Sequence, residues 1–379
     1  MNNMSNTKYY NLPNTSTSLV IGCAGSGKTS CYIEPILKDL KDESCIVIDS
    51  RGTLYEKYKK SLLSRGYNVK LLDIDNSESD TYNPFDYLNT DYDCVQLAHS
   101  FIQSVSKIED NFFKNTTESL LTALICYIHM KYAGTNRHNF SEVIKLCSMM
   151  HSDFNTVKDM FEELRKANSY CLAVKRFDDF IFTCEGKTLN NIIIDLAVKL
   201  SVFNIPNVIN SLSTSDKNIE LKGLLDTNTV VFLKISINDL TYDFIHNIFI
   251  TQVLDMLNNN SPKKLRIILD DFQRLNLGFD NQILLQLCSI FDKYDNTDNL
   301  KTDIIIQSIA QLKQGAYRNL IIQRCKAVIC LGVISEEDCT FFMELVHVDV
   351  KGLPLEKLLV VKRDKFKAFA EKYNKIHEI

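Results

Sequence analysis

The stretch VIGCAGSGKTS, residues 20–30, decides the fold of this chain. It holds three of the chain's 12 glycines, followed directly by Lys28 and Thr29. Residues 22–29 fit the pattern Gly-x-x-x-x-Gly-Lys-Thr/Ser, in which glycines let backbone N–H groups turn inward around phosphate oxygens. The apolar run TSLVI at 17–21 precedes the loop, and CYIEPILKDL, with helical spacing, follows it. The order strand, loop, helix predicts a phosphate-binding loop at a helix N-terminus.

This loop predicts which residues bind a nucleotide. We assign the binding set to Gly22, Cys23, Ala24, Gly25, Ser26, Gly27, Lys28, Thr29 and Ser30, with Asp49 from the end of the next predicted strand. Lys28 is expected to reach the β and γ phosphates, and the Thr29 hydroxyl is expected to bind Mg²⁺. The predicted cofactors are therefore ATP and Mg²⁺.

Two aspartates follow another apolar run, in RIILDDF at 266–272. In a parallel sheet both would lie at the carboxyl end of the strand, where ligands bind in open α/β folds. We assign Asp270 to the metal, and Asp271 to positioning or activating the attacking water. The alternative is an ordinary strand end with solvated aspartates.

A third strand is predicted to end in IIIQS, which places Gln307 and Ser308 at the same edge of the sheet. A glutamine there can orient water or sense the γ-phosphate, so we include Gln307 with Lys28 and Asp271 as catalytic residues. The alternative is that Ser308 caps a helix and Gln307 is simply exposed.

The whole-chain properties are those of a soluble globular protein. Hydrophobic residues make up 45% and charged residues 24% of 379 residues, and the formal net charge of −4 excludes a basic coat for nucleic acid. The 12 cysteines form no Cys-x-x-Cys pair, which favours buried, reduced thiols and no structural zinc. The polar N-terminus carries no signal peptide, and no apolar run reaches the roughly 18 residues of a membrane span. We therefore expect a cytoplasmic protein.

The periodicity predicts an α/β domain split by helices. Strands are predicted at 17–21, 44–50 and 67–75, with helices between them, which indicates a parallel sheet with crossover connections. From about 90 to 205 the spacing is almost entirely helical, and the alternation of strands and helices resumes at 229. We predict residues 1–88 and 206–379 as the two parts of a nucleotide-binding domain, and 89–205 as an inserted all-α domain.

With these residues in hand, the chain resembles the type IV secretion coupling proteins, the conjugative DNA-transfer ATPases, from about residue 10 to 365. The landmarks besides the phosphate loop are VIDSRGTLYEKYKKSLLSRGYNVKLLDID, YNPFDY, NFFKNTTESLLTALICYI, GKTLNNIIIDLAVKLSVFNIP, LDDF and IIIQSIAQL. The resemblance implies a RecA-like P-loop NTPase domain plus an all-α domain, assembled as a hexamer around DNA. It implies single-stranded DNA with a relaxase, and the type IV secretion or conjugation machinery, as partners.

The chain departs from the family's pattern in three ways. It lacks the transmembrane helices with which family members usually begin, so membrane contact would come only through a partner. Asp271 stands where the family has glutamate, which shortens the water-activating carboxylate by one methylene. The arginine-rich stretch expected before the glutamine strand reads FDKYDNTDNLKTD, and Arg318 or Arg324 would have to substitute.

Three functions remain open from the sequence. The first is an ATP-driven, DNA-translocating coupling ATPase that delivers DNA or a relaxase–DNA substrate to the secretion channel. The second is a nucleotide-binding adaptor or regulator of the transfer complex with weak hydrolysis, which the shorter Asp271 and the missing arginine suggest. The third is another P-loop DNA motor, such as a packaging or septal translocase.

Overall fold

The computed structural model divides into two units. The described residues are 15–76, 78–106, 111–184, 186–226, 228–234, 242–275, 282–295, 297–312, 316–332, 335–346, 350, 357–362 and 371–374. The first unit comes from segments 1–71, 221–235 and 254–379, and the second from segments 72–220 and 236–253. The boundaries that the sequence predicted at 88/89 and 205/206 stay a prediction.

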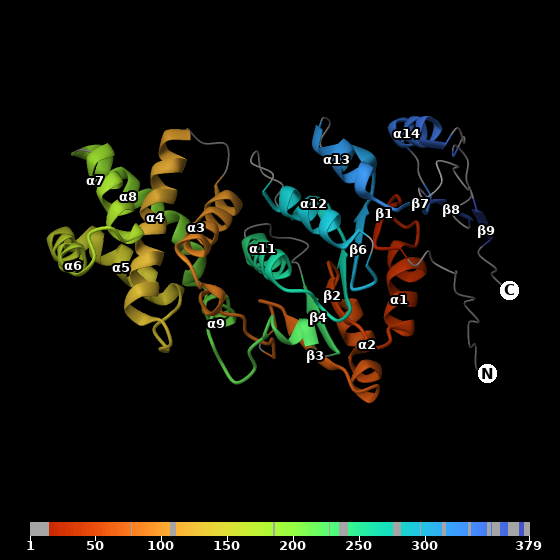
Figure 1. Cartoon of the computed structure of the whole chain (residues 1–379), viewed down its shortest axis with the longest axis horizontal. Helices are drawn as coiled ribbons and strands as arrows, with labels where there is room; N and C mark the ends of the chain where they lie inside the picture. The colour runs from red at the N-terminus through yellow and green to blue at the C-terminus, as the bar shows by residue number, and fades with distance from the viewer. Residues whose placement is uncertain are drawn as a thin grey trace. The chain divides into compact units, whose positions relative to one another are not determined.

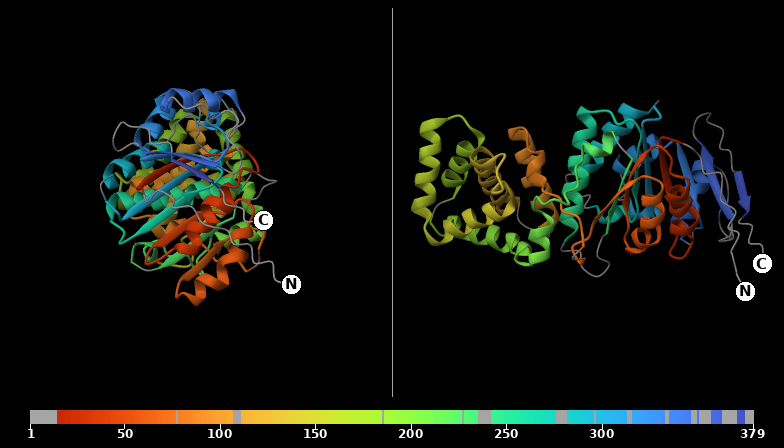
Figure 2. Two further views of the ribbon diagram at one scale, coloured as in Figure 1. Left: turned by 90° about the vertical axis from the view of Figure 1, so that its right-hand side faces the viewer. Right: turned by 90° about the horizontal axis from the view of Figure 1, so that it is seen from below.

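The first unit is built on one sheet (Figure 1). Its strands are β1 (Thr17–Ile21), β2 (Ser44–Ile48), β3 (Asn68–Leu72), β4 (Thr229–Leu233), β5 (Leu265–Leu269), β6 (Leu300–Ile306), β7 (Ala327–Cys330), β8 (Lys357–Lys362) and β9 (Glu371–Asn374). The described strands follow the order β3-β4-β2-β5-β6-β1-β7-β8-β9, and the left view of Figure 2 shows their twist. The pairs from β4 to β7 are parallel, and β8 and β9 add an antiparallel hairpin.

Helices cover this sheet, as parallel strands require. They are the π-helical turn η1 (Lys28–Ile33), α1 (Glu34–Asp39), α2 (Thr53–Ser64), α10 (Gly223–Asp226), α12 (Gln282–Tyr294), α13 (Ala316–Arg324) and α14 (Glu336–Val346), with the 3-10 turns η5 (Phe272–Arg274) and η6 (Ile309–Gln311). Strands β1, β2, β4 and β5 are buried along their whole length. Side chains of α1 and α2 pack with alternate strand residues in one core, and Figure 1 shows α12 across the sheet from them. The predicted α/β class with a mostly parallel sheet is confirmed.

The second unit is helical, as predicted. Its elements are η2 (Pro84–Tyr87), α3 (Asp91–Val105), α4 (Asn111–Tyr132), α5 (Phe140–Ser152), α6 (Phe154–Ala167), α7 (Leu172–Thr183), α8 (Lys187–Leu200), η3 (Ser201–Asn204) and α9 (Pro206–Ser211), with the first part of α11 (Asp243–Asn259). Between residues 72 and 220 the described backbone adds a single bridge, Thr81 to Asn218.

Aromatic rings in stacked and edge-to-face contact form the centre of this helical unit. Phe140 lies 4.7 Å from Phe203 and 5.1 Å from Phe85 between ring centroids, and Phe101 lies 5.2 Å from Phe244. All five side chains are buried. Such rings remove large apolar areas from water, so they hold together helices that are distant in the chain. In the described ranges, no helix combines the length and apolar character that a membrane crossing requires.

Helix α3 begins with a reciprocal cap that should stabilise the second unit. The Thr90 side chain accepts a bond from the Asp93 backbone N–H, and the Asp93 carboxylate accepts one from the Thr90 backbone N–H at 2.8 Å. We expect Thr90→Ala to lower the free energy of unfolding of this unit by about 1 kcal/mol, because one N–H loses its acceptor. Urea unfolding followed by far-UV circular dichroism measures this change.

The matched control for the cap is Ser152→Ala. The Ser152 hydroxyl lies at the exposed end of α5 and donates back to the Ser148 carbonyl at 3.2 Å, so it caps no N–H group. Its removal should change the free energy of unfolding by less than about 0.5 kcal/mol. Equal effects of the two substitutions would show that the Thr90 cap contributes nothing.

Candidate functional site

The phosphate loop follows the carboxyl end of β1 and is held by both neighbouring strand ends. The Gly22 N–H donates to the Ile306 carbonyl at 3.1 Å, at the end of β6. The Cys23 N–H donates to the Gly332 carbonyl at 2.9 Å, just beyond β7. The loop therefore has a fixed place in the middle of the sheet.

Three glycines give the loop its shape. Gly25 and Gly27 have φ angles of +78° and +88°, a left-handed conformation that other residues rarely adopt. A Cβ atom on Gly22 would lie 2.4 Å from the Ser26 Oγ, which is too close for any side chain. The Ser26 hydroxyl is itself buried and has no hydrogen-bond partner among the described residues. The shape of this loop, together with the unpaired Ser26 hydroxyl inside it, is suited to binding an anion.

Lys28 bridges the loop in this structure. Its Nζ donates to the Gly22 carbonyl at 2.7 Å and to the Cys23 carbonyl at 3.0 Å. Burial lowers the pKa of Lys28 below its ordinary value, although the charges of Asp270 and Asp271 oppose this shift. The ammonium group thus lies within the loop, where a phosphate can compete for its two hydrogen bonds.

Asp270 and Asp271 lie directly beyond the carboxyl end of β5, as predicted. The Asp270 side chain is 7% exposed, and burial together with the Asp271 charge raises its pKa to about 6, against the opposing charge of Lys28. Asp271 is partly exposed and has a φ angle of +52°. Its backbone N–H donates to the Asp270 Oδ1 at 3.1 Å. The turn separates the two carboxylates, one buried toward Lys28 and one open to solvent.

Gln307 follows β6, the strand between β5 and β1. Its Nε2 donates to the Asp271 Oδ1 at 3.3 Å, so the structure brings together two of the three residues predicted as catalytic. Ser308 caps η6, since its Oγ accepts a bond from the Ala310 N–H. The alternative that the sequence left open is therefore correct for Ser308, while exposed Gln307 contacts a candidate carboxylate.

Asp49 has a local structural role that the sequence did not suggest. Its Oδ2 accepts bonds from the backbone N–H groups of Leu54 at 2.8 Å and Tyr55 at 3.1 Å, in the first turn of α2. Burial raises the pKa of Asp49, and these backbone donors oppose the rise. Asp49 therefore orders the loop after β2, and its assignment to the nucleotide site stays a prediction.

The remaining predicted binding residues line the loop and the start of η1. Ala24, Gly25 and Ser30 are exposed, and Cys23, Gly27 and Thr29 are partly exposed. An accessible Thr29 hydroxyl beside Lys28 and a buried Asp270 carboxylate are oxygen donors of the kind Mg²⁺ prefers. The residues present fit a magnesium nucleotide, and their individual roles stay predictions.

The two arginines considered as trans-acting groups already have partners within the chain. Arg318 donates to Glu337 at 2.8 Å, and Arg324 forms two bonds to Asp292 at 2.9 and 2.8 Å. To reach a nucleotide in another subunit, either arginine would first have to give up this ion pair. The structure gives no support to Arg318 or Arg324 as a substitute for the family's arginine.

Three buried polar residues near the site escaped the sequence analysis: Tyr32 in η1, Arg266 in β5 and Asp303 in β6. The Tyr32 hydroxyl donates to the Asp303 Oδ1 at 2.7 Å, and the Arg266 Nη1 donates to the Asp303 Oδ2 at 3.2 Å. The sequence signal that could have found them is a charged residue within an otherwise apolar strand. Arg266 interrupts LRIIL in this way, and Asp303 interrupts LKTDIII. Charged side chains in buried strands must pair with one another, because an unpaired buried charge costs a large amount of free energy.

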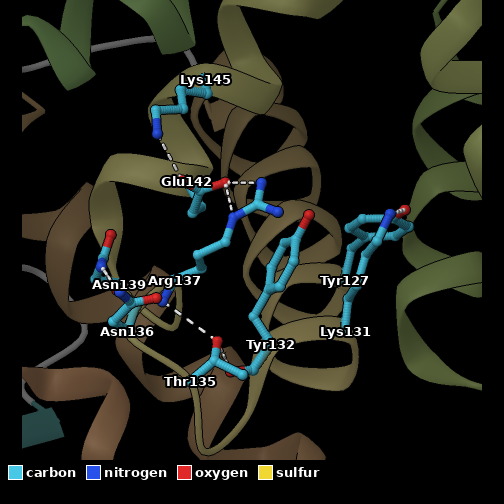
Figure 3. Close-up of polar contacts among 9 residues, drawn as sticks. All are labelled: Tyr127, Lys131, Tyr132, Thr135, Asn136, Arg137, Asn139, Glu142 and Lys145. Atoms are coloured by element: carbon cyan, nitrogen blue, oxygen red, sulfur yellow. Dashed lines mark hydrogen bonds and ion pairs between the residues drawn. The ribbon is translucent and has the colours of Figure 1, made fainter.

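The turn between α4 and α5 gathers basic and aromatic side chains in the helical unit (Figure 3). The Arg137 guanidinium lies 4.0 Å from the Tyr132 ring centroid, and Lys131 donates to the Tyr127 hydroxyl at 2.9 Å. Arg137 also pairs with Glu142; burial alone would raise the pKa of that carboxyl, but its basic partners lower it below the ordinary value. Much of the positive charge here is thus neutralised locally, consistent with a solvated helix face.

The comparisons with known proteins place this arrangement in context. The family model described as type IV secretory system conjugative DNA transfer matches residues 3–346. No curated protein matches the chain. The unbound bacterial conjugative coupling protein TrwBdeltaN70 is similar with a TM-score of 0.69 and 13% identity, over 96% of this chain and 86% of that one.

Two further solved structures have the same fold. The plasmid coupling protein TrwB in complex with ADP and Mg²⁺ gives a TM-score of 0.68 at 13% identity, over 96% of this chain and 86% of that one. VirB4 of Thermoanaerobacter pseudethanolicus gives 0.59 at 13% identity, over 94% and 90%. The similarity extends through both units of the chain.

Proposed function

Because the chain belongs to the type IV secretory system family of conjugative DNA transfer, we propose that it is a coupling ATPase that uses ATP hydrolysis to move DNA toward a secretion channel. One observation carries the proposal: the phosphate loop, the Asp270–Asp271 turn and Gln307 meet at the ends of the neighbouring strands β1, β5 and β6. TrwB structures contain ADP with Mg²⁺ or the ATP analogue ADPNP, which supports nucleotide as the ligand here.

The chain's own residues divide the work of binding between them. Inward-facing backbone N–H groups of the loop bind the phosphates, and Lys28 exchanges its two carbonyl acceptors for phosphate oxygens. Thr29 and Asp270 would hold Mg²⁺, which would supply positive charge to the phosphates when bound. Asp270 must be ionised to hold the metal, so Mg²⁺ binding should weaken as the pH falls below about 6, the pKa of this carboxyl.

Asp271 and Gln307 act on the attacking water. The Gln307 amide donates to Asp271, which fixes the direction of a carboxylate that is open to solvent. A carboxylate in this place can accept the proton of the water as it attacks, and the glutamine amide can hold the water in line. Asp271 also adopts a left-handed backbone conformation, which aspartate tolerates better than glutamate.

We expect Asp271→Asn to lower ATP turnover by about a hundredfold while ADP affinity changes less than twofold. Asparagine keeps the size and the left-handed backbone of Asp271 but cannot accept the proton. Steady-state phosphate release and a fluorescent ADP titration measure the two quantities. Asp298→Asn, at an exposed loop position, is the control and should leave both unchanged. Turnover within threefold of the wild type would remove Asp271 from the reaction.

The partners follow from the family and are proposed with the function. We propose single-stranded DNA with a relaxase as the cargo, a homo-oligomer such as a hexamer as the working form, and a cytoplasmic location in which a partner brings the protein to the inner face of the membrane. DNA binding should weaken steeply with salt, because phosphate contacts release counterions. Arg318 and Arg324 are paired with Glu337 and Asp292 within the chain, so we assign neither as a trans-acting arginine.

The decisive experiment is steady-state ATP turnover with and without single-stranded DNA. The coupling ATPase predicts turnover that DNA stimulates. Tight ATP binding without turnover, in the presence of DNA, would instead support a nucleotide-binding adaptor of the transfer complex. The paired arginines favour this second function, since a site without a trans-acting arginine hydrolyses slowly. Turnover that only double-stranded DNA stimulates would point to a packaging or septal translocase.

A further inference from the structure

A buried hydrogen-bonded network connects the three elements that carry the candidate site. Tyr32, Asp303 and Arg266 are 1%, 2% and 8% exposed. Both oxygens of the Asp303 carboxylate are occupied, one by the Tyr32 hydroxyl at 2.7 Å and the other by the Arg266 guanidinium at 3.2 Å. Glu43 approaches the Arg266 Nε at 3.7 Å, so the arginine is paired on two sides.

The spacing of this network along the chain is the same in all three elements. Tyr32 is four residues beyond Lys28, Arg266 is four residues before Asp270, and Asp303 is four residues before Gln307. In η1 that distance is about one helical turn, and in β5 and β6 it is about 13 Å of extended strand. Each member is thus joined by a short, regular backbone segment to one residue of the candidate site.

Packing alone does not require charged groups at this place. Apolar residues of similar volume often hold two strands together as well as a buried ion pair does, or better. A hydrogen-bonded carboxylate adds something that apolar packing lacks, namely a fixed direction and register between the groups it joins. The network therefore does more than close the core between β5 and β6.

We propose that Tyr32, Asp303 and Arg266 are positioning residues, which keep the helix after the phosphate loop in register with the strand ends at Asp270 and Gln307. When Lys28 leaves the Gly22 and Cys23 carbonyls for phosphate, η1 transmits the change to β6 through the Tyr32–Asp303 hydrogen bond. Nucleotide binding thereby adjusts Gln307, which already contacts Asp271 in this structure, to the position that it needs on the attacking water. This inference rests on the proposed hydrolysis site and adds the route by which occupancy reaches it.

The test removes a single oxygen atom. Tyr32→Phe keeps the ring in the core and deletes the bond to Asp303. We expect kcat for ATP to fall about tenfold, since small misplacements of catalytic groups are costly, while KM and the Kd of ADP with Mg²⁺ change less than twofold. A purely structural bond would lower the melting temperature and leave kcat unchanged, and that result would overturn the inference.

Tyr58→Phe is the matched control. The Tyr58 hydroxyl is buried and donates to the Glu34 Oε2 at 3.0 Å, so it tethers α2 to α1, the helix that continues η1. It makes the same kind of bond to a carboxylate but has no connection to β6 through it. We expect kcat of this variant to equal the wild-type value. Equal losses of kcat in both tyrosine variants would also overturn the proposal.

A double variant tests the route itself. In a Gln307→Ala background, Tyr32→Phe should cause no further fall in kcat, because the residue that it aligns is already gone. If the two fold-changes multiply, the two residues act independently and the proposed route is wrong.

Hydrogen exchange separates this inference from the proposed function. Adding ADP with Mg²⁺ should slow amide exchange at residues 303–307 in the wild type and leave it unchanged in Tyr32→Phe. This readout does not depend on turnover. If the wild type bound ATP without hydrolysing it, the proposed ATPase activity would be refuted. The exchange of the wild type and of Tyr32→Phe could still be compared, and that comparison would test the role of the network. An equal change of exchange in both proteins would refute the network's role.

Discussion

Replacing Lys28 with alanine is expected to reduce ATP turnover by at least about a thousandfold. In the folded protein the Lys28 ammonium group already lies within the loop, 2.7 Å from the Gly22 carbonyl. It is therefore preorganised to meet the charge that develops on the transferred phosphate, and removing one such donor typically costs 10²–10³ in rate. Losing its contribution to binding adds to this. Phosphate release at ATP concentrations well below KM, where the rate reports kcat/KM, measures the combined effect.

The control for this variant must separate a loss of ATP turnover from a loss of stability of the phosphate loop. Lys28→Ala also removes two hydrogen bonds to loop carbonyls, which should cost about 1–2 kcal/mol of stability. Lys41→Ala changes an exposed lysine a short distance downstream and should affect neither turnover nor melting temperature. Nucleotide should raise the melting temperature of the wild type and of the control, but not that of Lys28→Ala. Turnover within tenfold of the wild type would refute the assigned role.

Asp270→Asn should abolish Mg²⁺-dependent turnover and, at the same time, stabilise the protein at pH 7 in the absence of ligands. Burial raises the pKa of Asp270 to about 6, so its charged form is disfavoured in the folded state. The folded protein holds the Asp270 proton more tightly than the unfolded chain. Stability therefore falls as the pH rises from about 4 to about 6, and the full cost, of the order of 2 kcal/mol, persists above pH 6. Asparagine carries no charge and avoids this cost.

Unfolding in urea at pH 7.5 and at pH 4.5, without nucleotide or metal, measures the predicted difference. The variant should be more stable than the wild type at the higher pH and equal to it at the lower pH. Asp298→Asn, at an exposed position, should behave as the wild type at both. If the variant were less stable than the wild type at pH 7.5, the ionised Asp270 carboxylate would stabilise the folded state. That result would contradict the raised pKa of Asp270.

Sequence periodicity predicts much of this fold because the elements are strongly patterned. Apolar residues at helical spacing in QILLQLCSIFDKY at 282–294 and EEDCTFFMELV at 336–346 predict two helices, and these have the bounds of α12 and α14. Helix α7 lies within residues 90–205, which the sequence predicted as almost entirely helical, and its buried residues Ala173, Val174, Phe177 and Phe180 have helical spacing. Strand β9 was missed because its four residues show no apolar alternation, and it forms against the edge of β8.

The sequence places the candidate site at strand ends but cannot give its internal contacts. Asp270, Asp271 and Gln307 were predicted to share one edge, since parallel strands end together. The bond between Gln307 and Asp271 and the capping role of Asp49 depend on side-chain directions that appear only in the folded chain. In the sequence Asp303 is only a polar residue within an apolar strand. Its role depends on hydrogen bonds from Tyr32 and Arg266, which are more than 30 residues away in the chain.

The strand order has a consequence for how the protein is made. Strand β1, which leads into the phosphate loop, pairs with β6 and β7, and Ile21 lies beside Ile306 and Cys330. A ribosome that adds about 5–20 residues per second needs roughly 15–60 s to reach those partners after β1 has emerged. Throughout that time the loop has neither of its neighbouring strands, so it reaches its place in the sheet long after it has been synthesised. Chains that stop before residue 300 lack β6 and β7 and cannot hold the loop there.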